Sequence, residues 1–210
     1  MGDLQRAVRV VRHHASAWGL DPHRVGVLGC SAGGLLASFV ATTSGSSKEQ
    51  ESADNMFAPS NDMIDQATSA RPDLLVLVYP VTRPLCVAEW RDAAVRDARF
   101  GSSAKPGSSA KTRHPASATN QTMQAFDTVA RVSDSHPPTF LAHSTEDTGL
   151  LAAEHTEAYF AALTRCGVRD CQMVCEDFGE HGCALVRAST LPASLPPAWL
   201  LSFFRLEAVV

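Results

Sequence analysis

One short segment has the residue types and spacing of a nucleophilic serine site. Residues 29–33, Gly-Cys-Ser-Ala-Gly, match the pattern Gly-x-Ser-x-Gly. In this pattern the serine lies on a sharp turn between a strand and a helix, and glycines leave room for the closely packed backbone. Residues 24–28 have strand character and residues 34–42 are small and apolar, so the flanking sequence fits. A tight turn with a solvent-facing serine is the alternative, and the context favours Ser31 as a nucleophile.

A serine hydroxyl is a weak nucleophile unless a base removes its proton, so a histidine and an orienting acid should follow. In folds with this turn the acid comes next in the chain and the histidine last. Of eight histidines, His181 lies in a glycine-flanked loop after the last expected strand, from which it can reach the carboxyl edge of a sheet. The acid is expected after the third strand, where Glu146 and Asp147 are adjacent and spacing does not choose between them. His143, at the end of that strand, is expected to be a structural, hydrogen-bonding residue.

Helical and strand patterns alternate along the chain, which predicts an α/β fold: a three-layer sandwich of a mostly parallel sheet with helices on both faces. Strands are expected over residues 24–28, 73–79, 138–143 and 171–176, and helices over 3–17, 31–42, 150–164 and from Pro196 toward the end. Two polar stretches, at about 43–71 and 101–122, are expected to be flexible insertions in a single domain of 210 residues.

Composition narrows the classes of partner. A formal net charge of -4 and a pI near 6.0 argue against a nucleic-acid surface. The longest apolar run, residues 74–79, is too short to cross a bilayer, so no membrane partner is expected. The first residues lack the apolar segment of a signal peptide, which predicts a cytoplasmic protein. The six cysteines form no Cys-x-x-Cys pair and His-Glu-x-x-His is absent, so no metal and no cofactor is expected.

Four segments in combination resemble the acetylxylan-esterase-like and feruloyl-esterase-like α/β-hydrolases. They are residues 19–34, 71–73 with 77–81, 137–143 and 178–182, and the resemblance covers most of the chain outside the two insertions. Carried over by position, it implies Ser31 as nucleophile, Asp147 rather than Glu146 as acid, and His181 as base. The amide of Ala32, the residue after the nucleophile, is then an oxyanion donor.

The resemblance also implies strands before residue 1, so the expected fold is an α/β-hydrolase domain shortened at its N-terminus. A His-Gly-Gly loop normally supplies the second oxyanion amide, and this sequence has Gly33-Gly34 as its only Gly-Gly pair. Removing one such donor typically costs about a hundredfold to a thousandfold in turnover. The strand at residues 25–28 is expected to present an unpaired apolar edge, a site for homodimer formation.

Two functions remain open at this stage. The resemblance implies a serine hydrolase that cleaves acyl or acetyl esters, including those of acylated carbohydrates, through an acyl-enzyme. The alternative is a catalytically impaired homologue that acts as a binding or interaction module. Labelling of Ser31 by a fluorophosphonate, with turnover of nitrophenyl acetate, distinguishes the two.

Overall fold

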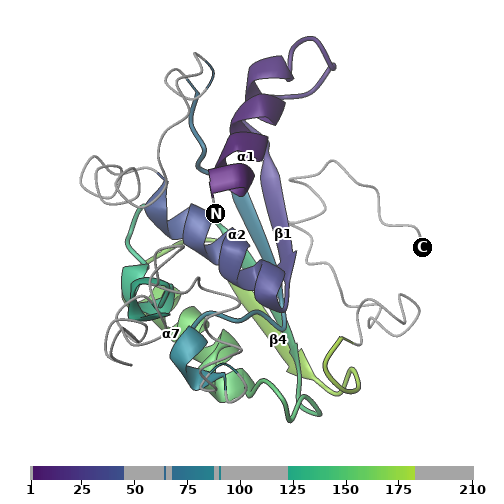
Figure 1. Cartoon of the computed structure of the whole chain (residues 1–210), viewed down its shortest axis with the longest axis vertical. Coiled ribbons are helices and arrows are strands. Elements are labelled where there is room, and N and C mark those ends of the chain that lie inside the picture. The colour runs from purple at the N-terminus through teal and green to yellow at the C-terminus, as the bar shows by residue number, and fades with distance from the viewer. Residues whose placement is uncertain (1, 45–63, 65–67, 88–89, 91–122, 183–210) are drawn as a thin grey trace, which may run out of the picture.

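The structure of the chain, a computed structural model, describes residues 2–44, 64, 68–87, 90 and 123–182 (Figure 1). Most of the insertion expected at 43–71, all of the one expected at 101–122 and the helix expected from Pro196 lie outside the described residues. The described part contains the elbow around Ser31, the acid loop and the loop that carries His181. It therefore includes every residue to which the sequence assigned a chemical role.

The centre of the fold is a sheet of four parallel strands in the order β1-β2-β3-β4. The strands are β1 (Gly26–Cys30), β2 (Leu74–Val78), β3 (Thr139–Ser144) and β4 (Cys171–Glu176). The predicted parallel sheet is confirmed, with the first strand displaced by two residues toward the serine. Because all strands run in one direction, the loops that follow them meet at one edge of the sheet.

Three α-helices that lie wholly within the described residues accompany these strands: α1 (Gly2–His14), α2 (Ala32–Thr43) and α7 (Thr156–Arg165). Short 3-10 turns lie at Pro84–Cys86, Val129–Arg131 and Ala152–Glu154. The helix expected over 150–164 is thus divided into a 3-10 turn and α7. The division occurs at His155, whose side chain binds the backbone after β2 and whose backbone (φ -118°, ψ -74°) departs from helical values.

Apolar residues of α2 and α7 cover one face of the sheet. They form one buried cluster with the strands: Ala37, Ala41, Leu75, Leu77, Leu141, Tyr159 and Leu163. Side chains on the opposite face form a second cluster: Leu74, Val76, Phe140 and Ala142. The continuous apolar sequence of β2 therefore reflects a strand buried on both faces, as expected for the interior of a parallel sheet.

A partly buried ion pair fixes α1 against the start of the sheet. The Arg12 guanidinium lies 2.9 Å from Oδ2 of Asp73 and also donates to the carbonyl oxygens of Arg71 and Pro22. The same Asp73 oxygen accepts the N–H of Val25 at 2.9 Å. One carboxylate thus joins α1 to the beginnings of β1 and β2.

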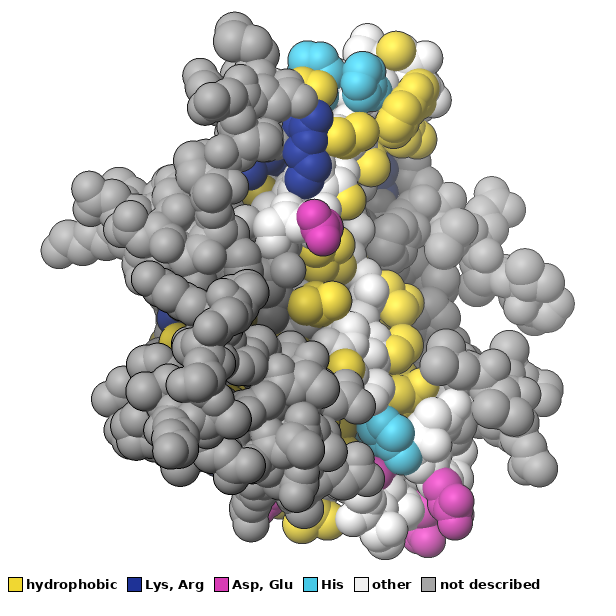
Figure 2. All heavy atoms as spheres, viewed as in Figure 1, with side chains coloured by type: hydrophobic (Ala, Val, Ile, Leu, Met, Phe, Trp, Pro, Cys, Tyr) yellow, Lys and Arg dark blue, Asp and Glu magenta, His cyan; other side chains and the backbone are white. Residues whose placement is uncertain are grey.

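The strand β1 lies at one edge of the described sheet, with β2 as its one described neighbour. Leu28 on this strand is 66% exposed, and Figure 2 shows further hydrophobic side chains along this side of the molecule. Homodimer formation through this edge stays a prediction. No described helix is both long and apolar enough to cross a membrane.

Candidate active site

Ser31 lies on a strained turn between β1 and α2. Its backbone has φ 53° and ψ -124°, and a positive φ is uncommon for a residue with a Cβ atom. The turn is held from two directions: the Ser31 N–H donates to the carbonyl of Val78 at 3.1 Å, and the Ser31 carbonyl accepts the N–H groups of Gly34 and Val81, both at 2.9 Å. These bonds stabilise a conformation that the serine would not adopt by itself.

Two glycines allow the close packing of this turn. A Cβ atom at Gly29 would collide with the carbonyl oxygen of Gly33, and one at Gly34 would lie 2.5 Å from the Cβ of Pro80. A Cβ at Gly33 would meet nothing within 4 Å. Close packing therefore requires glycine at position 29 and at position 34, which directly follows the motif. It does not explain the glycine at position 33.

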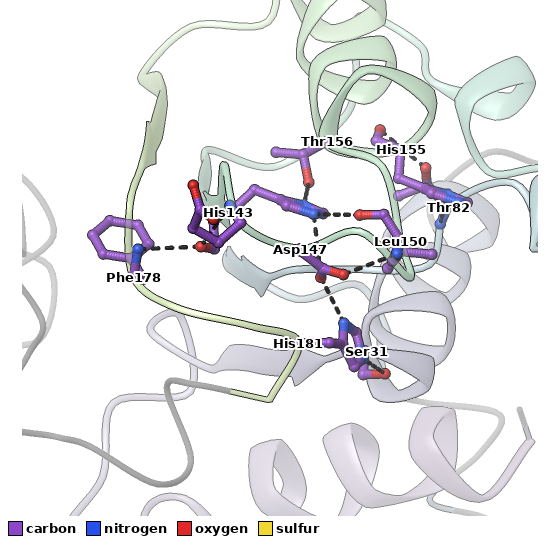
Figure 3. A network of polar contacts seen from close by, with 11 residues as sticks. Ser31, Thr82, His143, Asp147, Leu150, His155, Thr156, Phe178 and His181 are labelled. Atoms are coloured by element: carbon purple, nitrogen blue, oxygen red, sulfur yellow. Dashed lines mark hydrogen bonds and ion pairs between the residues drawn. The ribbon is translucent and has the colours of Figure 1, made fainter.

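Figure 3 shows the three predicted chemical residues together. Ser31 Oγ lies 2.7 Å from His181 Nε2, and His181 Nδ1 lies 2.6 Å from Asp147 Oδ2. A carboxylate can only accept, so the Asp147 contact places the imidazole proton on Nδ1. The Nε2 atom then carries a lone pair and accepts the proton of the Ser31 hydroxyl.

Burial separates the two adjacent acids between which spacing alone does not choose. The Asp147 side chain is 0% exposed, and its Oδ1 accepts the N–H of Leu150 at 2.9 Å while Oδ2 faces His181. Glu146 is exposed, and its contact in this turn is a backbone one, from its N–H to Ser144 Oγ at 3.2 Å. The structure thus brings Asp147, and not Glu146, to the histidine.

His181 extends from a loop that two glycines shape. Gly179 (φ 92°) and Gly182 (φ 89°) adopt left-handed conformations that glycine reaches without strain. The loop is tied to the acid loop because Ser144 Oγ accepts the N–H of Phe178 at 3.1 Å. The His181 side chain is 38% exposed, so one side of the imidazole remains accessible.

A second histidine, His143, lies behind the carboxylate and is fully buried. Its Nε2 donates to the Leu150 carbonyl at 2.7 Å, so its Nδ1 accepts the hydroxyl proton of Thr156 at 2.6 Å. The same Nε2 is 3.5 Å from Asp147 Oδ2. Burial lowers the pKa of His143, opposed by the Leu150 carbonyl and Asp147, so the ring is neutral at pH 7. The expected hydrogen-bonding role of His143 is confirmed.

Sequence reasoning missed two residues that support the site. His155 Nδ1 accepts the N–H groups of Thr82 and Arg83 at 3.2 and 3.3 Å, which fixes the loop after β2 to the start of α7. Burial lowers the pKa of His155 to about 4. Tyr79, directly after β2, packs its ring against that of His181, with centroids 4.9 Å apart. Neither role has a local sequence signature, because both depend on segments distant in the chain.

The Ala32 amide begins α2 beside the nucleophile, and within the described residues no acceptor takes its proton. A helix N-terminus favours developing negative charge, so this N–H can stabilise an oxyanion. No three His, Cys, Asp or Glu side chains in the described segments are grouped as metal ligands.

The contacts of Ser31, His181 and Asp147 suit nucleophilic attack with proton transfer through a histidine.

The sequence signature described as BD-FAE matches residues 1–161, more than three quarters of the chain. The chain belongs to the BD-FAE family. This is a family of α/β-hydrolase esterases, and the match confirms the family resemblance inferred from the sequence motifs.

Individual relatives agree with membership of the BD-FAE family. A solved acetyl ester-xyloside bifunctional hydrolase from Caldicellulosiruptor lactoaceticus superposes with a TM-score of 0.70 at 28% identity, over 98% of this chain and 66% of its own. A carboxylesterase from Lactobacillus plantarum has a TM-score of 0.58 at 18% identity, over 90% of this chain and 57% of its own, and shows the fold. An acetylxylan esterase from Xylanibacter ruminicola is 43% identical over 44 residues, 21% of this chain and 9% of that protein. The chain thus spans about two thirds or less of these relatives.

Proposed function

We propose that this chain hydrolyses carboxylic esters, with Ser31 as nucleophile, His181 as general base and acid, and Asp147 as the orienting acid. One observation carries the proposal: the unbroken pair of short hydrogen bonds, 2.7 Å from Ser31 to His181 and 2.6 Å from His181 to Asp147. Membership of an esterase family gives independent support.

The proposed reaction has two halves. Ser31 Oγ attacks the ester carbonyl carbon while His181 Nε2 takes its proton, and the buried Asp147 carboxylate stabilises the imidazolium. The tetrahedral oxyanion accepts a hydrogen bond from the Ala32 N–H. His181 then gives its proton to the leaving alkoxide oxygen, which departs as the alcohol and leaves an acyl group on Ser31. Water attacks this acyl-enzyme with proton transfer to His181, the bond from the acyl carbon to Ser31 Oγ breaks, and His181 returns the proton to Ser31 Oγ as the carboxylic acid departs.

For the substrate, we propose acetyl or other short acyl esters, with acylated carbohydrates of the xylan type as the preferred class. This rests on two relatives named for such substrates, the acetyl ester-xyloside hydrolase and the acetylxylan esterase. Both names describe the substrates of those relatives, and the proposal extends that substrate class to this chain. The half-exposed position of His181 is consistent with a site that admits the end of a saccharide.

The test combines covalent labelling with turnover. The purified chain and two variants, Ser31→Ala and Ser16→Ala, are treated with a fluorophosphonate, and hydrolysis of 4-nitrophenyl acetate and of acetylated xylo-oligosaccharides is followed. Ser16 is exposed in a turn after α1 and serves as the matched control. We expect labelling and turnover in the wild type and in Ser16→Ala, and neither in Ser31→Ala. A folded wild-type chain that shows no labelling and no turnover rejects the proposal.

A further inference from the structure

The two hydrogen bonds of His181, the base of the proposed reaction, do not by themselves fix the orientation of its imidazole ring. Hydrogen bonds fix Nδ1 of His181 to Asp147 and Nε2 to Ser31, but the ring can still turn about the line that joins these two nitrogens. Its loop contains two glycines and its side chain is 38% exposed. A misplacement of about 1 Å can cost a hundredfold in rate, so a further contact on the ring has consequences for catalysis.

Tyr79 supplies such a contact. Its ring centroid is 4.9 Å from that of His181, and the two planes are inclined by 62°, an edge-to-face arrangement favoured between aromatic rings. Tyr79 itself is 1% exposed. We propose that Tyr79 is a positioning residue that sets the tilt of the His181 imidazole toward Ser31. This inference rests on the function proposed above.

The backbone at Tyr79 is strained. Its φ is 36°, in the left-handed region that a residue with an aromatic side chain rarely adopts, and Pro80 follows it directly. The conformation persists because the Tyr79 N–H donates to the Ala142 carbonyl at 2.7 Å and because Pro80 packs closely over Gly34. Backbone strain of this kind is concentrated at functional sites, where the surrounding structure over-determines it.

The residues beside Tyr79 hold the nucleophile. Val78 accepts the N–H of Ser31 through its carbonyl, and Val81 donates its N–H to the Ser31 carbonyl. Residues 78–81 therefore bind the serine backbone at two points and contact the base through the Tyr79 ring between them. A single four-residue segment fixes Ser31 and His181 relative to each other, although the two residues are 150 positions apart in the chain.

The contact with His181 is made by the aromatic ring of Tyr79. Phenylalanine should therefore retain the positioning role, and a branched aliphatic side chain should not. Leucine, like tyrosine, carries a single heavy atom on its Cβ. Tyr79→Leu therefore removes the aromatic ring and leaves the backbone strain at the positive φ unchanged.

The experiment measures kcat and KM for 4-nitrophenyl acetate in Tyr79→Phe and Tyr79→Leu. We expect kcat in Tyr79→Leu to fall about tenfold with KM changed less than twofold, and kcat in Tyr79→Phe to stay within about threefold of wild type. Tyr159 is the matched control, because its buried hydroxyl bonds to His136 at 2.7 Å and its ring belongs to the cluster beneath α7. Tyr159→Phe and Tyr159→Leu should lower the melting temperature and leave kcat of the folded protein within twofold.

The inference is overturned if folded Tyr79→Leu keeps wild-type kcat, or if Tyr79→Phe loses as much as Tyr79→Leu. Should Tyr79→Leu fail to fold, Tyr79→Met provides the same loss of the ring with an unbranched side chain. The ring proton resonances of His181 give a readout independent of turnover: they should carry a ring-current shift in wild type and Tyr79→Phe that disappears in Tyr79→Leu. A wild-type chain without turnover that still shows this shift refutes the proposed function and leaves the contact established, whereas absence of the shift refutes the positioning role.

Discussion

Two histidines face the carboxylate of Asp147, and they differ in burial and in hydrogen-bond partners. His143 comes from the interior of the sheet, is fully buried, and has both ring nitrogens engaged by Thr156 and Leu150. His181 comes from a glycine-containing loop and is 38% exposed, with its Nε2 directed at the Ser31 hydroxyl. The same side chain is thus a structural element in one place and, in the proposed reaction, the proton acceptor in the other. Burial and the identity of the hydrogen-bond partners decide between the two roles.

The largest effect is expected from removing the exposed member of this pair. In His181→Ala, kcat for 4-nitrophenyl acetate should fall by about four to six orders of magnitude, because the serine loses its base. The melting temperature should change little, because the side chain is half-exposed. His23→Ala, at an exposed turn, is the control and should keep full activity. Residual activity above a few per cent in His181→Ala would show that another group accepts the proton.

The carboxylate between the two histidines is tested next. In Asp147→Asn an amide N–H can face His181 Nδ1, so the ring proton moves to Nε2 and the serine hydroxyl loses its acceptor; kcat should fall about 10⁴-fold. Glu146→Gln is the matched control, because this neighbouring side chain is exposed. Its kcat should stay within twofold. Equal losses in the two variants would contradict the assignment of Asp147.

Buried histidines should appear in the pH dependence of stability. Burial is the main cause that lowers the pKa of both His136 and His155 from the ordinary 6.5 to about 4. The unfolded chain therefore binds more protons than the folded one between these values, so stability is complete above pH 6.5 and is lost as pH falls toward 4. Each shift corresponds to about 3 kcal/mol. Urea unfolding at pH 7, 5.5 and 4.5 measures the slope.

His136→Phe tests the share of one buried histidine in this pH dependence. The variant removes one buried titrating group, so the loss of stability between pH 6.5 and 4 should become smaller even though the Tyr159 hydroxyl loses its partner. An unchanged slope in His136→Phe would contradict this assignment.

The smallest effect on kcat is expected from replacing His143, the buried partner of Asp147. His143→Leu leaves the Thr156 hydroxyl and the Leu150 carbonyl without their ring partner, so the free energy of unfolding should fall by about 2 to 4 kcal/mol. In the folded fraction kcat should fall less than tenfold. Chemical denaturation and steady-state kinetics measure both quantities. A loss of kcat as large as that of His181→Ala would place His143 in the proton transfer.

Much of the local structure could be predicted from neighbouring residues. The four strands and the helix after Ser31 lie where their apolar patterns indicate, with boundaries displaced by one or two residues. The helix expected over 150–164 was too long, because the side chain of His155 turns to bind backbone groups of Thr82 and Arg83. A bond over more than seventy positions has no trace in a local pattern.

The chain by itself determined the order serine, acid, histidine, the glycines around the turn, and the parallel sheet whose carboxyl edge collects the three. These follow from the patterns of neighbouring residues and from the resemblance of four segments to an esterase family. Only the tertiary structure selected Asp147 over Glu146 by geometry, separated His143 from His181, and placed the Tyr79 ring against the base. The physical reason is that burial and hydrogen-bond partners, which set the charge and direction of a side chain, are supplied by segments far apart in sequence.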